Sequence, residues 1–181
     1  MEKKTKDFVL NFARSVIRAY VEDGRILEVP KDCPKELKEK RGVFVTLYKN
    51  GMLRGCIGIP YPVASGIENL RNAAVAATRD PRFPPLAKDE LKDVKIEVSL
   101  LTEPKVIKVS KPKEYLEKIK EGIDGIIIKK GLCEALYLPQ VWEEIPDKVE
   151  FLESLCLKAG LAPDDWQRAI LYKFQVDAAE E

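Results

Sequence analysis

The 181-residue chain contains no histidine, and this absence excludes several kinds of catalytic and metal site from within it. A Ser-His-Asp triad, a Cys-His dyad and a His-ligated zinc, iron or copper ion all require an imidazole. Cysteine pairs of the C-x-x-C kind are also missing, which argues against a structural zinc knot. We therefore expect neither a metal ion nor another cofactor.

The sequence also lacks long apolar runs and an excess of one charge. No apolar run approaches the ~18 residues that a membrane-spanning helix needs, and the charged N-terminal stretch 1–7 does not resemble a signal peptide. The 31 Lys+Arg nearly balance the 30 Asp+Glu, whereas nucleic-acid binding needs concentrated positive charge. We expect a cytoplasmic protein that binds neither membranes nor nucleic acid. Its charge-rich, amide-poor composition resembles that of thermophile proteins.

Periodic apolar residues predict helices and strands that do not alternate one to one. Phe8, Phe12, Val16 and Tyr20 recur every four residues, which predicts a helix ending near Gly24. Two hairpins are predicted, the first turning at Asn50-Gly51 and the second near 130–131. The other predicted elements are helices at 63–78, 112–120, 139–144 and 147–158, a strand at 94–100 paired with 105–109, and a last strand at 169–176 before a frayed acidic end.

This pattern predicts the α+β class, with mainly antiparallel sheets and flanking helices rather than a Rossmann sheet. The length allows one domain over residues 1–181, which can consist of two lobes.

The segment Leu53–Gly58 carries the clearest chemical signal. Two glycines, Gly55 and Gly58, weaken a strand by roughly 0.5–1 kcal/mol each, and strand glycines mark a bulge or a close backbone approach. On a regular strand Arg54 and Cys56 would share a face, and a nearby cation favours the reactive thiolate. Cys56 is thus either a nucleophile beside an anion-binding guanidinium or a small core residue.

A nucleophilic thiol normally has a base, which here cannot be histidine. Glu97, on an alternating strand, and Asp80 are the candidates, unless Arg54 alone favours the thiolate. The segment 79–83 is either an Arg-bearing loop that clamps a carboxylate or phosphate, or a helix exit held by an internal Asp–Arg pair. Gln140 could hydrogen-bond a ligand, whereas the neighbouring Trp142 suits a core position.

Several segments together resemble the family named after the AMME syndrome chromosomal region. They are Leu53-Arg-Gly-Cys-Ile-Gly58, Asp80-Pro-Arg-Phe-Pro-Pro85, Glu97-Val-Ser-Leu-Leu101, Gly125-Ile126, Tyr137-Leu-Pro-Gln-Val141 and the leucine-rich helix at 151–161. The resemblance covers roughly residues 5–176. It implies an α+β fold with two sub-lobes around a cleft and the Arg-Gly-Cys-Ile-Gly strand near that cleft.

The resemblance implies no established activity. It implies radical-SAM and Memo-like proteins as partners, because prokaryotic family members are often encoded beside them. By motif it brings forward Arg54, Gly55, Cys56 and Gly58 first, followed by Asp80, Arg82, Glu97 and Gln140. Some relatives have a histidine before the glycine that is Gly125 here, and this chain has Asp124 instead.

Two functional hypotheses follow. In the first, a cleft around Cys56 binds or modifies a small anionic substrate, with Cys56, Arg54 and Glu97 as catalytic candidates. Gly55, Gly58, Asp80, Arg82 and Gln140 are then the substrate-binding candidates. In the second, the protein is a non-catalytic partner or scaffold for radical-SAM and Memo-like proteins, and the same strand is an interaction edge.

Overall fold

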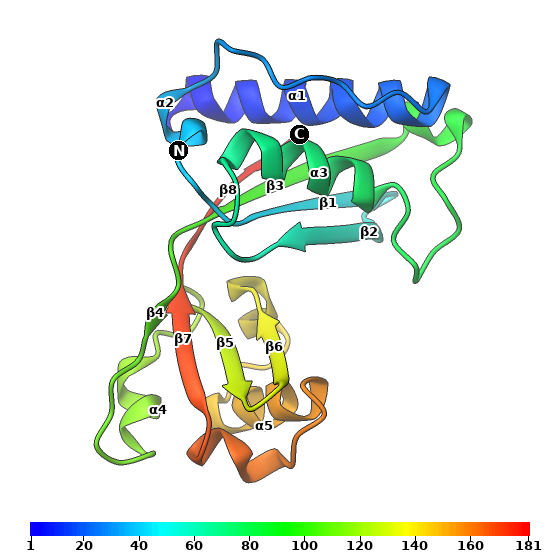
Figure 1. Ribbon diagram of the computed structural model, residues 1–181. Coiled ribbons are helices and arrows are strands. Elements are labelled where there is room, and N and C mark those ends of the chain that lie inside the picture. Colours follow the sequence, from blue (N-terminus) through cyan, green and yellow to red (C-terminus); the bar gives the residue numbers. More distant parts are fainter. The chain divides into compact units, whose positions relative to one another are not determined.

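The computed structural model describes residues 1–181, which form two compact units (Figure 1). The first unit comprises Met1–Glu103 together with Asp177–Glu181, and the second comprises Pro104–Val176. Each unit combines helices with a four-stranded sheet, and both sheets contain antiparallel strand pairs. The predicted α+β class is therefore confirmed.

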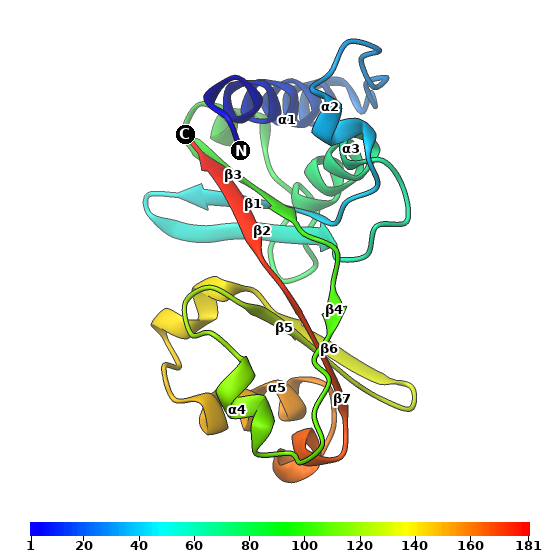
Figure 2. The same ribbon diagram turned by 90° about the vertical axis from the view of Figure 1, so that its left-hand side faces the viewer.

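The first unit places helices on one side of its sheet. Its elements are α1 (Lys3–Asp23), α2 (Lys35–Lys38), β1 (Val43–Lys49), β2 (Met52–Ile59), α3 (Gly66–Ala77), the 3-10 helix η1 (Lys88–Lys92), β3 (Val94–Leu101) and β8 (Val176–Glu180). The strand order is β2-β1-β3-β8. Figures 1 and 2 show α1 and α3 on the same side of this sheet.

Local sequence explains the ends of these elements. Gly24 ends α1 in the left-handed conformation, at φ 68°, as predicted. Ser65 and Glu68 form a capping box at the start of α3, in which each side chain accepts from the other residue's backbone. The Asn50-Gly51 turn has positive φ at both residues, which matches the type I′ hairpin that the sequence predicts.

The β1 register separates an apolar face of the first sheet from a polar one. Val45 and Leu47 pair with Val98 and Ile96 on β3, and all four side chains are buried in the core that α1 and α3 cover. Their neighbours along β1 point to the opposite face, because side chains alternate along a strand. No α-helix of the first unit covers that opposite face, which we call the helix-free face; the face toward α1 and α3 is the helix-bearing side (Figure 2).

The second unit has a sheet of its own, in the order β4-β7-β5-β6. Its elements are β4 (Lys105–Val106), α4 (Glu114–Lys118), β5 (Gly125–Lys130), β6 (Cys133–Tyr137), η2 (Pro139–Glu143), α5 (Lys148–Lys158), η3 (Pro163–Gln167) and β7 (Ile170–Phe174). Ile126, Ile128 and Leu171 pack with Phe151 and Leu155 of α5 in a second hydrophobic core. The predicted second hairpin is present, and its turn lies at residues 131–132.

Three details of the predicted fold are wrong. The strand predicted at 94–100 does not pair with residues 105–109, because the chain passes from the first unit to the second at Glu103–Pro104 and β4 pairs with β7. The strand predicted at 169–176 is present as β7, but it is not the last strand, because β8 follows it and joins the other sheet. The acidic end does not fray, since Ala179 is buried and the Glu181 carboxylate contacts Arg14.

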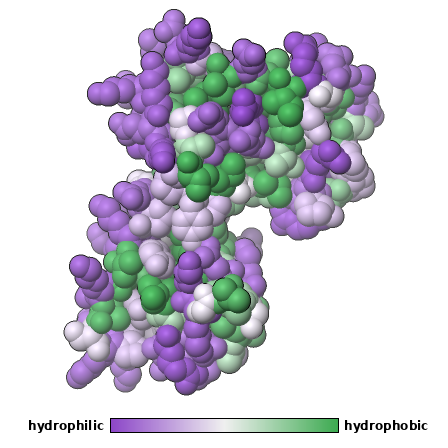
Figure 3. All heavy atoms as spheres, viewed as in Figure 1, coloured by the Kyte–Doolittle hydropathy of each residue, from purple (hydrophilic) through white to green (hydrophobic).

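The surface of both units is mixed in polarity. On the face shown in Figure 3, hydrophilic residues cover much of each unit, with hydrophobic residues between them. None of the helices is long and apolar enough to cross a membrane.

Candidate functional site

A β-bulge at Arg54 determines where the side chains of the Arg-Gly-Cys-Ile-Gly segment point. Gly55 lies opposite Leu47 and Leu53 lies opposite Tyr48, so Arg54 is an extra residue in β2. The extra residue shifts the alternation of side chains by one position, so two residues that are two apart across the bulge lie on opposite faces of the sheet. The prediction that Arg54 and Cys56 share one face is therefore wrong. Arg54 lies on the helix-bearing side, and Cys56 lies on the opposite face.

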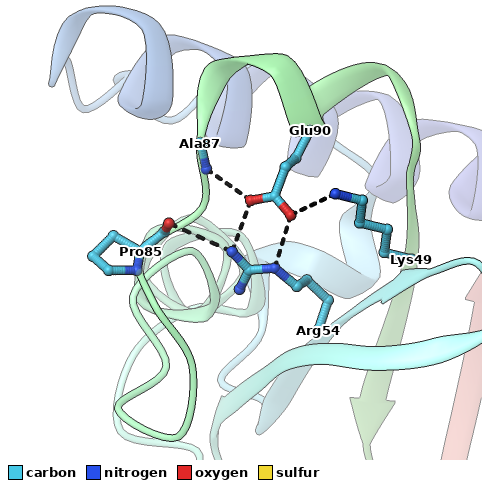
Figure 4. Close-up of polar contacts among 5 residues, drawn as sticks. All are labelled: Lys49, Arg54, Pro85, Ala87 and Glu90. Carbon is cyan, nitrogen blue, oxygen red and sulfur yellow. Dashed lines mark hydrogen bonds and ion pairs between the residues drawn. The ribbon is translucent and has the colours of Figure 1, made fainter.

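The Arg54 guanidinium is held by Glu90 of η1 (Figure 4). Nε and Nη2 of Arg54 donate to the two carboxylate oxygens of Glu90 at 3.1 and 2.8 Å, and Lys49 Nζ donates to Oε1 at 2.9 Å. Both partners are mostly buried, with side chains 15% and 14% exposed. The Arg54 hydrogen bonds hold the pKa of Glu90 well below its usual range, supported by the backbone N–H of Ala87.

We predict that Glu90→Gln destabilises the first unit by about 2 kcal/mol at pH 7, because a mostly buried guanidinium loses its charged partner. The pKa of Glu90 is lowered by folding, so its contribution is complete above the unfolded value of about 4.3 and is lost as the pH falls below it. Urea unfolding followed by circular dichroism at pH 7 and pH 3 measures both effects. An equal difference between wild type and variant at the two pH values contradicts this account.

Close packing explains both glycines of the segment. A Cβ atom at Gly55 would lie 2.5 Å from the Ala77 carbonyl oxygen at the end of α3. A Cβ at Gly58 would lie 2.2 Å from the ring of Phe44, its partner on β1. Each glycine therefore permits a close approach that a side chain would prevent.

Asp80 and Arg82 occupy the free edge of β2 at Cys56. Asp80 Oδ2 accepts from the backbone N–H of Cys56 at 2.9 Å, and Arg82 Nη2 donates to the Cys56 carbonyl oxygen at 3.3 Å. Arg82 also donates to both carboxylate oxygens of Asp80, at 3.0 and 2.7 Å. Asp80 is only 2% exposed, and its bond to Arg82 holds its pKa well below the usual range. The pair blocks this edge against another strand.

The Phe83 ring contacts both Arg54 of β2 and Arg82 of the loop after α3. The guanidinium carbons of Arg54 and Arg82 lie 6.0 and 5.7 Å from the centre of the Phe83 ring. These distances fall in the range of cation–π contacts. The segment 80–83 thus contains an internal ion pair and packs against β2 through hydrogen bonds at the strand edge and through an aromatic ring.

Cys56 belongs to a polar row that crosses three strands. Thr46 lies opposite Cys56 on one side and opposite Glu97 on the other, so the three side chains share the helix-free face. Thr46 Oγ1 donates to Cys56 Sγ at 3.4 Å. Beyond this row, Ser99 Oγ donates to Glu97 Oε1 at 3.2 Å. Thr46 is buried, whereas Cys56 and Glu97 are half-buried.

The environment of Cys56 favours the neutral thiol. Burial raises the pKa of Cys56, and the carboxylates of Asp80 and Glu97 raise it further, while the Thr46 hydrogen bond and the Arg82 charge oppose the rise. Arg54, which we expected to lower this pKa, is turned to the other side and paired with Glu90. The geometry thus lacks the cation that was expected to activate the thiol.

A cavity of ≈ 340 Å³ lies on the first unit beside the polar row. Tyr48, Lys95 and Glu97 line it, together with the Asn50-Gly51 turn, Asp93, Ile96, Glu180 and Glu181. Burial raises the pKa of Tyr48, and the charge of Glu97 adds to the rise. Sequence reasoning missed Thr46 and Tyr48, although their alternation with Val45 and Leu47 along β1 was a usable signal.

The second unit holds Gln140, the remaining predicted site residue, in η2. Trp142 is a core residue, as interpreted from the sequence: it is 4% exposed and stacks on Phe151, with ring centroids 3.6 Å apart. Its Nε1 donates to the backbone oxygen of Asp124 at 2.8 Å. The buried Asp124 carboxylate accepts from Lys120 N and Lys173 Nζ, at 3.0 and 3.3 Å.

The structure contains no group of three or more Cys, Asp and Glu side chains arranged to hold a metal ion. All four cysteines are free thiols.

Comparisons with known proteins place the whole chain in one family. The AMMECR1 family profile matches residues 10–179. Protein MJ0810 of Methanocaldococcus jannaschii is 49% identical, over 96% of this chain and 89% of its own length. Protein MK0488 of Methanopyrus kandleri is 48% identical, over 97% and 87%. The crystal structure of uncharacterized protein PH0010 from Pyrococcus horikoshii matches with a TM-score of 0.93 and 42% identity, covering 100% of this chain and 93% of the other. The chain therefore belongs to the AMMECR1 family, as its resemblance to the family of the AMME syndrome chromosomal region predicted.

Proposed function

We propose that the first unit binds a small polar ligand on the helix-free face of its sheet. The observation that supports this most is the row of Cys56, Thr46 and Glu97. This row ends at the cavity, which Glu97 lines together with Tyr48. A cavity with a few convergent polar groups is the usual form of a small-molecule site. Four free thiols suit a reducing cytoplasm, where we place this activity.

In this proposal Cys56 contacts the ligand as a neutral thiol. Its raised pKa keeps it protonated near neutral pH, so it is not a resting nucleophile. Glu97 is the acidic side chain of the row and lies one strand beyond Thr46. A covalent reaction of Cys56 would require a bound ligand that first lowers the pKa of its thiol. Non-covalent binding is therefore the simpler function.

The charges favour a ligand with a cationic or hydrogen-bond-donating group. Asp93, Glu97 and Glu180 line the cavity against a single lysine, Lys95, whereas Glu181, also in the lining, is already paired with Arg14. The two arginines that suggested an anionic ligand, Arg54 and Arg82, each already form an ion pair. We therefore propose a small amine rather than an anion as the ligand class, and the experiment distinguishes the two.

The test is an NMR titration of the full-length protein with 1,4-diaminobutane and, separately, with succinate. We expect the diamine to shift the backbone amides of Thr46, Tyr48 and Glu97. Glu97→Gln should weaken its binding about tenfold, because a hydrogen bond to a charged group contributes ~1.5–3 kcal/mol. The matched control, Glu28→Gln, removes an exposed carboxylate outside the cavity and should change nothing. Succinate binding at these residues would favour the anionic ligand, and binding of neither probe would contradict the proposal.

The second candidate function is that of a non-catalytic partner for radical-SAM or Memo-like proteins. Asp80 and Arg82 occupy the β2 edge at Cys56, so we do not propose that edge as the contact. The observation that favours a partner is Leu132, which is fully exposed at the tip of the β5–β6 hairpin. Co-purification with a Memo-like protein that Leu132→Asp abolishes, and the exposed-site control Leu157→Asp does not, would support this role.

A further inference from the structure

A shallow groove of ≈ 460 Å³ runs along the outer side of α3, away from the face that carries Cys56. Its floor is apolar and comprises Ile57 of β2, Ile26 of the loop after α1, and Val75 and Ala76 of α3. Tyr20, Asn72 and Arg79 complete the lining. The groove lies within the first unit and is independent of the proposed amine site.

The helix presents two stripes of side chains, and only one of them belongs to the core. Leu70, Ala73 and Ala77 are buried against the sheet and α1. The second stripe comprises Asn72, Val75 and Ala76, with the i, i+3 and i+4 spacing of one helix face, and Arg79 follows in the turn after the helix ends. Ile26, in the loop after α1, is 57% exposed. An apolar surface is therefore left beside α3 that the fold itself does not bury.

Arg79 brings a positive charge to the end of this apolar surface. Its guanidinium donates to the phenol oxygen of Tyr20 at 3.1 Å, a neutral partner, and it forms no ion pair with a carboxylate. Arg82, three residues further along, is by contrast paired with Asp80. Exposed and unneutralised, Arg79 retains its capacity to bind a carboxylate through two parallel hydrogen bonds.

We propose that this groove binds an aliphatic monocarboxylate. Its carboxylate contacts Arg79 and the Tyr20 hydroxyl, and its hydrocarbon chain lies on Ile26, Ile57 and Val75. Arg79 is the one cation of the groove and has no carboxylate partner, and it lies at the end of the apolar floor. The head group of the ligand should therefore be an anion. The volume lies in the range of small-molecule sites, roughly 300–1,000 Å³.

The experiment measures binding of octanoate to the full-length protein by calorimetry, with NMR to locate it. We expect the amides of Val75, Ala76 and Arg79 to shift. Arg79→Gln should weaken binding about tenfold or more, as the loss of a charge-assisted hydrogen bond does, and Arg79→Lys should weaken it less. Ile26→Ser should also weaken it, and each methylene from hexanoate to octanoate should strengthen it about fourfold.

Two controls separate the contribution of the charge to binding from that of the ligand's hydrocarbon chain. Arg18→Gln removes an exposed arginine of α1 outside the groove and should leave the affinity unchanged. Octanol, which keeps the chain without the charge, should bind about tenfold more weakly than octanoate. The proposal is overturned if octanoate does not bind at millimolar concentration, if Arg79→Gln binds it as tightly as wild type, or if octanol binds equally well.

Discussion

Replacing Asp80 with alanine is expected to destabilise the first unit by about 3 kcal/mol. The carboxylate is buried, and it accepts from the Cys56 and Arg82 backbone N–H groups as well as from the Arg82 side chain. Removing it leaves the Cys56 N–H without its partner and Arg82 without its counter-ion. Such losses cost ~1–3 kcal/mol for an orphaned donor and ~3–5 for a fully buried pair. Because the Arg82 side chain is 56% exposed, we take the lower end of the ~3–5 kcal/mol range for the lost pair.

Circular dichroism in urea is the appropriate measurement, because both tryptophans, Trp142 and Trp166, belong to the second unit and their fluorescence reports on that unit. Arg82→Gln is the matched control and should cost about 1 kcal/mol, since it leaves the Asp80 bond to Cys56 in place. The low pKa of Asp80 means that its contribution is complete above about pH 4 and is lost in acid. A loss below 1 kcal/mol for Asp80→Ala at pH 7 would rule out the edge-capping role.

Gly55→Ala is expected to destabilise the first unit by about 2–3 kcal/mol. In most strands this change would be favourable by roughly 0.5–1 kcal/mol, because alanine loses less conformational entropy than glycine. Here the new Cβ would lie 2.5 Å from the backbone oxygen of Ala77, and a backbone atom cannot rotate away as a side chain can. The end of α3 must move from β2, and overpacking of this kind costs ~1–3 kcal/mol.

Gly51→Ala separates this clash from backbone strain. Gly51 has a φ of 76° and open space around its Cβ position, so alanine there should cost about 1 kcal/mol of strain and no packing. Hydrogen exchange at the end of α3 should accelerate in Gly55→Ala and stay unchanged in Gly51→Ala. Equal unfolding free energies and exchange rates in the two variants would contradict the packing role of Gly55.

Local patterns predicted most of the fold. The four-residue repeat of α1, the Asn50-Gly51 hairpin and the helix at 147–158 depend on residues near one another in the chain, and all three are present. Strand pairing across long separations could not be predicted in this way. The alternation of β3 shows that one of its faces is buried, but it does not name β1 and β8 as neighbours. Nor did the sequence 169–176 reveal that the chain changes sheets at Gln175.

The sequence predicted which candidate residues gather near β2 better than it predicted their contacts. The sequence singled out Arg54, Cys56, Asp80, Arg82 and Glu97, and the structure places all five on or beside the strands β2, β1 and β3. Their partners could not be predicted, because a single-residue bulge turns Arg54 from Cys56 toward Glu90, 36 residues away. The expected guanidinium–thiol pair is thus replaced by two carboxylate–guanidinium pairs and a separate thiol.

The proposal that Cys56 is a neutral member of a binding face is tested most directly by the pKa of its thiol. The measurement is the thiolate absorbance of a variant in which Cys33, Cys133 and Cys156 are replaced by serine or alanine, followed against pH. Iodoacetamide labelling of the same variant provides an independent rate. We predict a pKa above the ordinary thiol value of about 8.5, and labelling near pH 7 slower than that of a free thiol. A pKa below that value, with faster labelling, would contradict the proposal and identify Cys56 as an activated nucleophile.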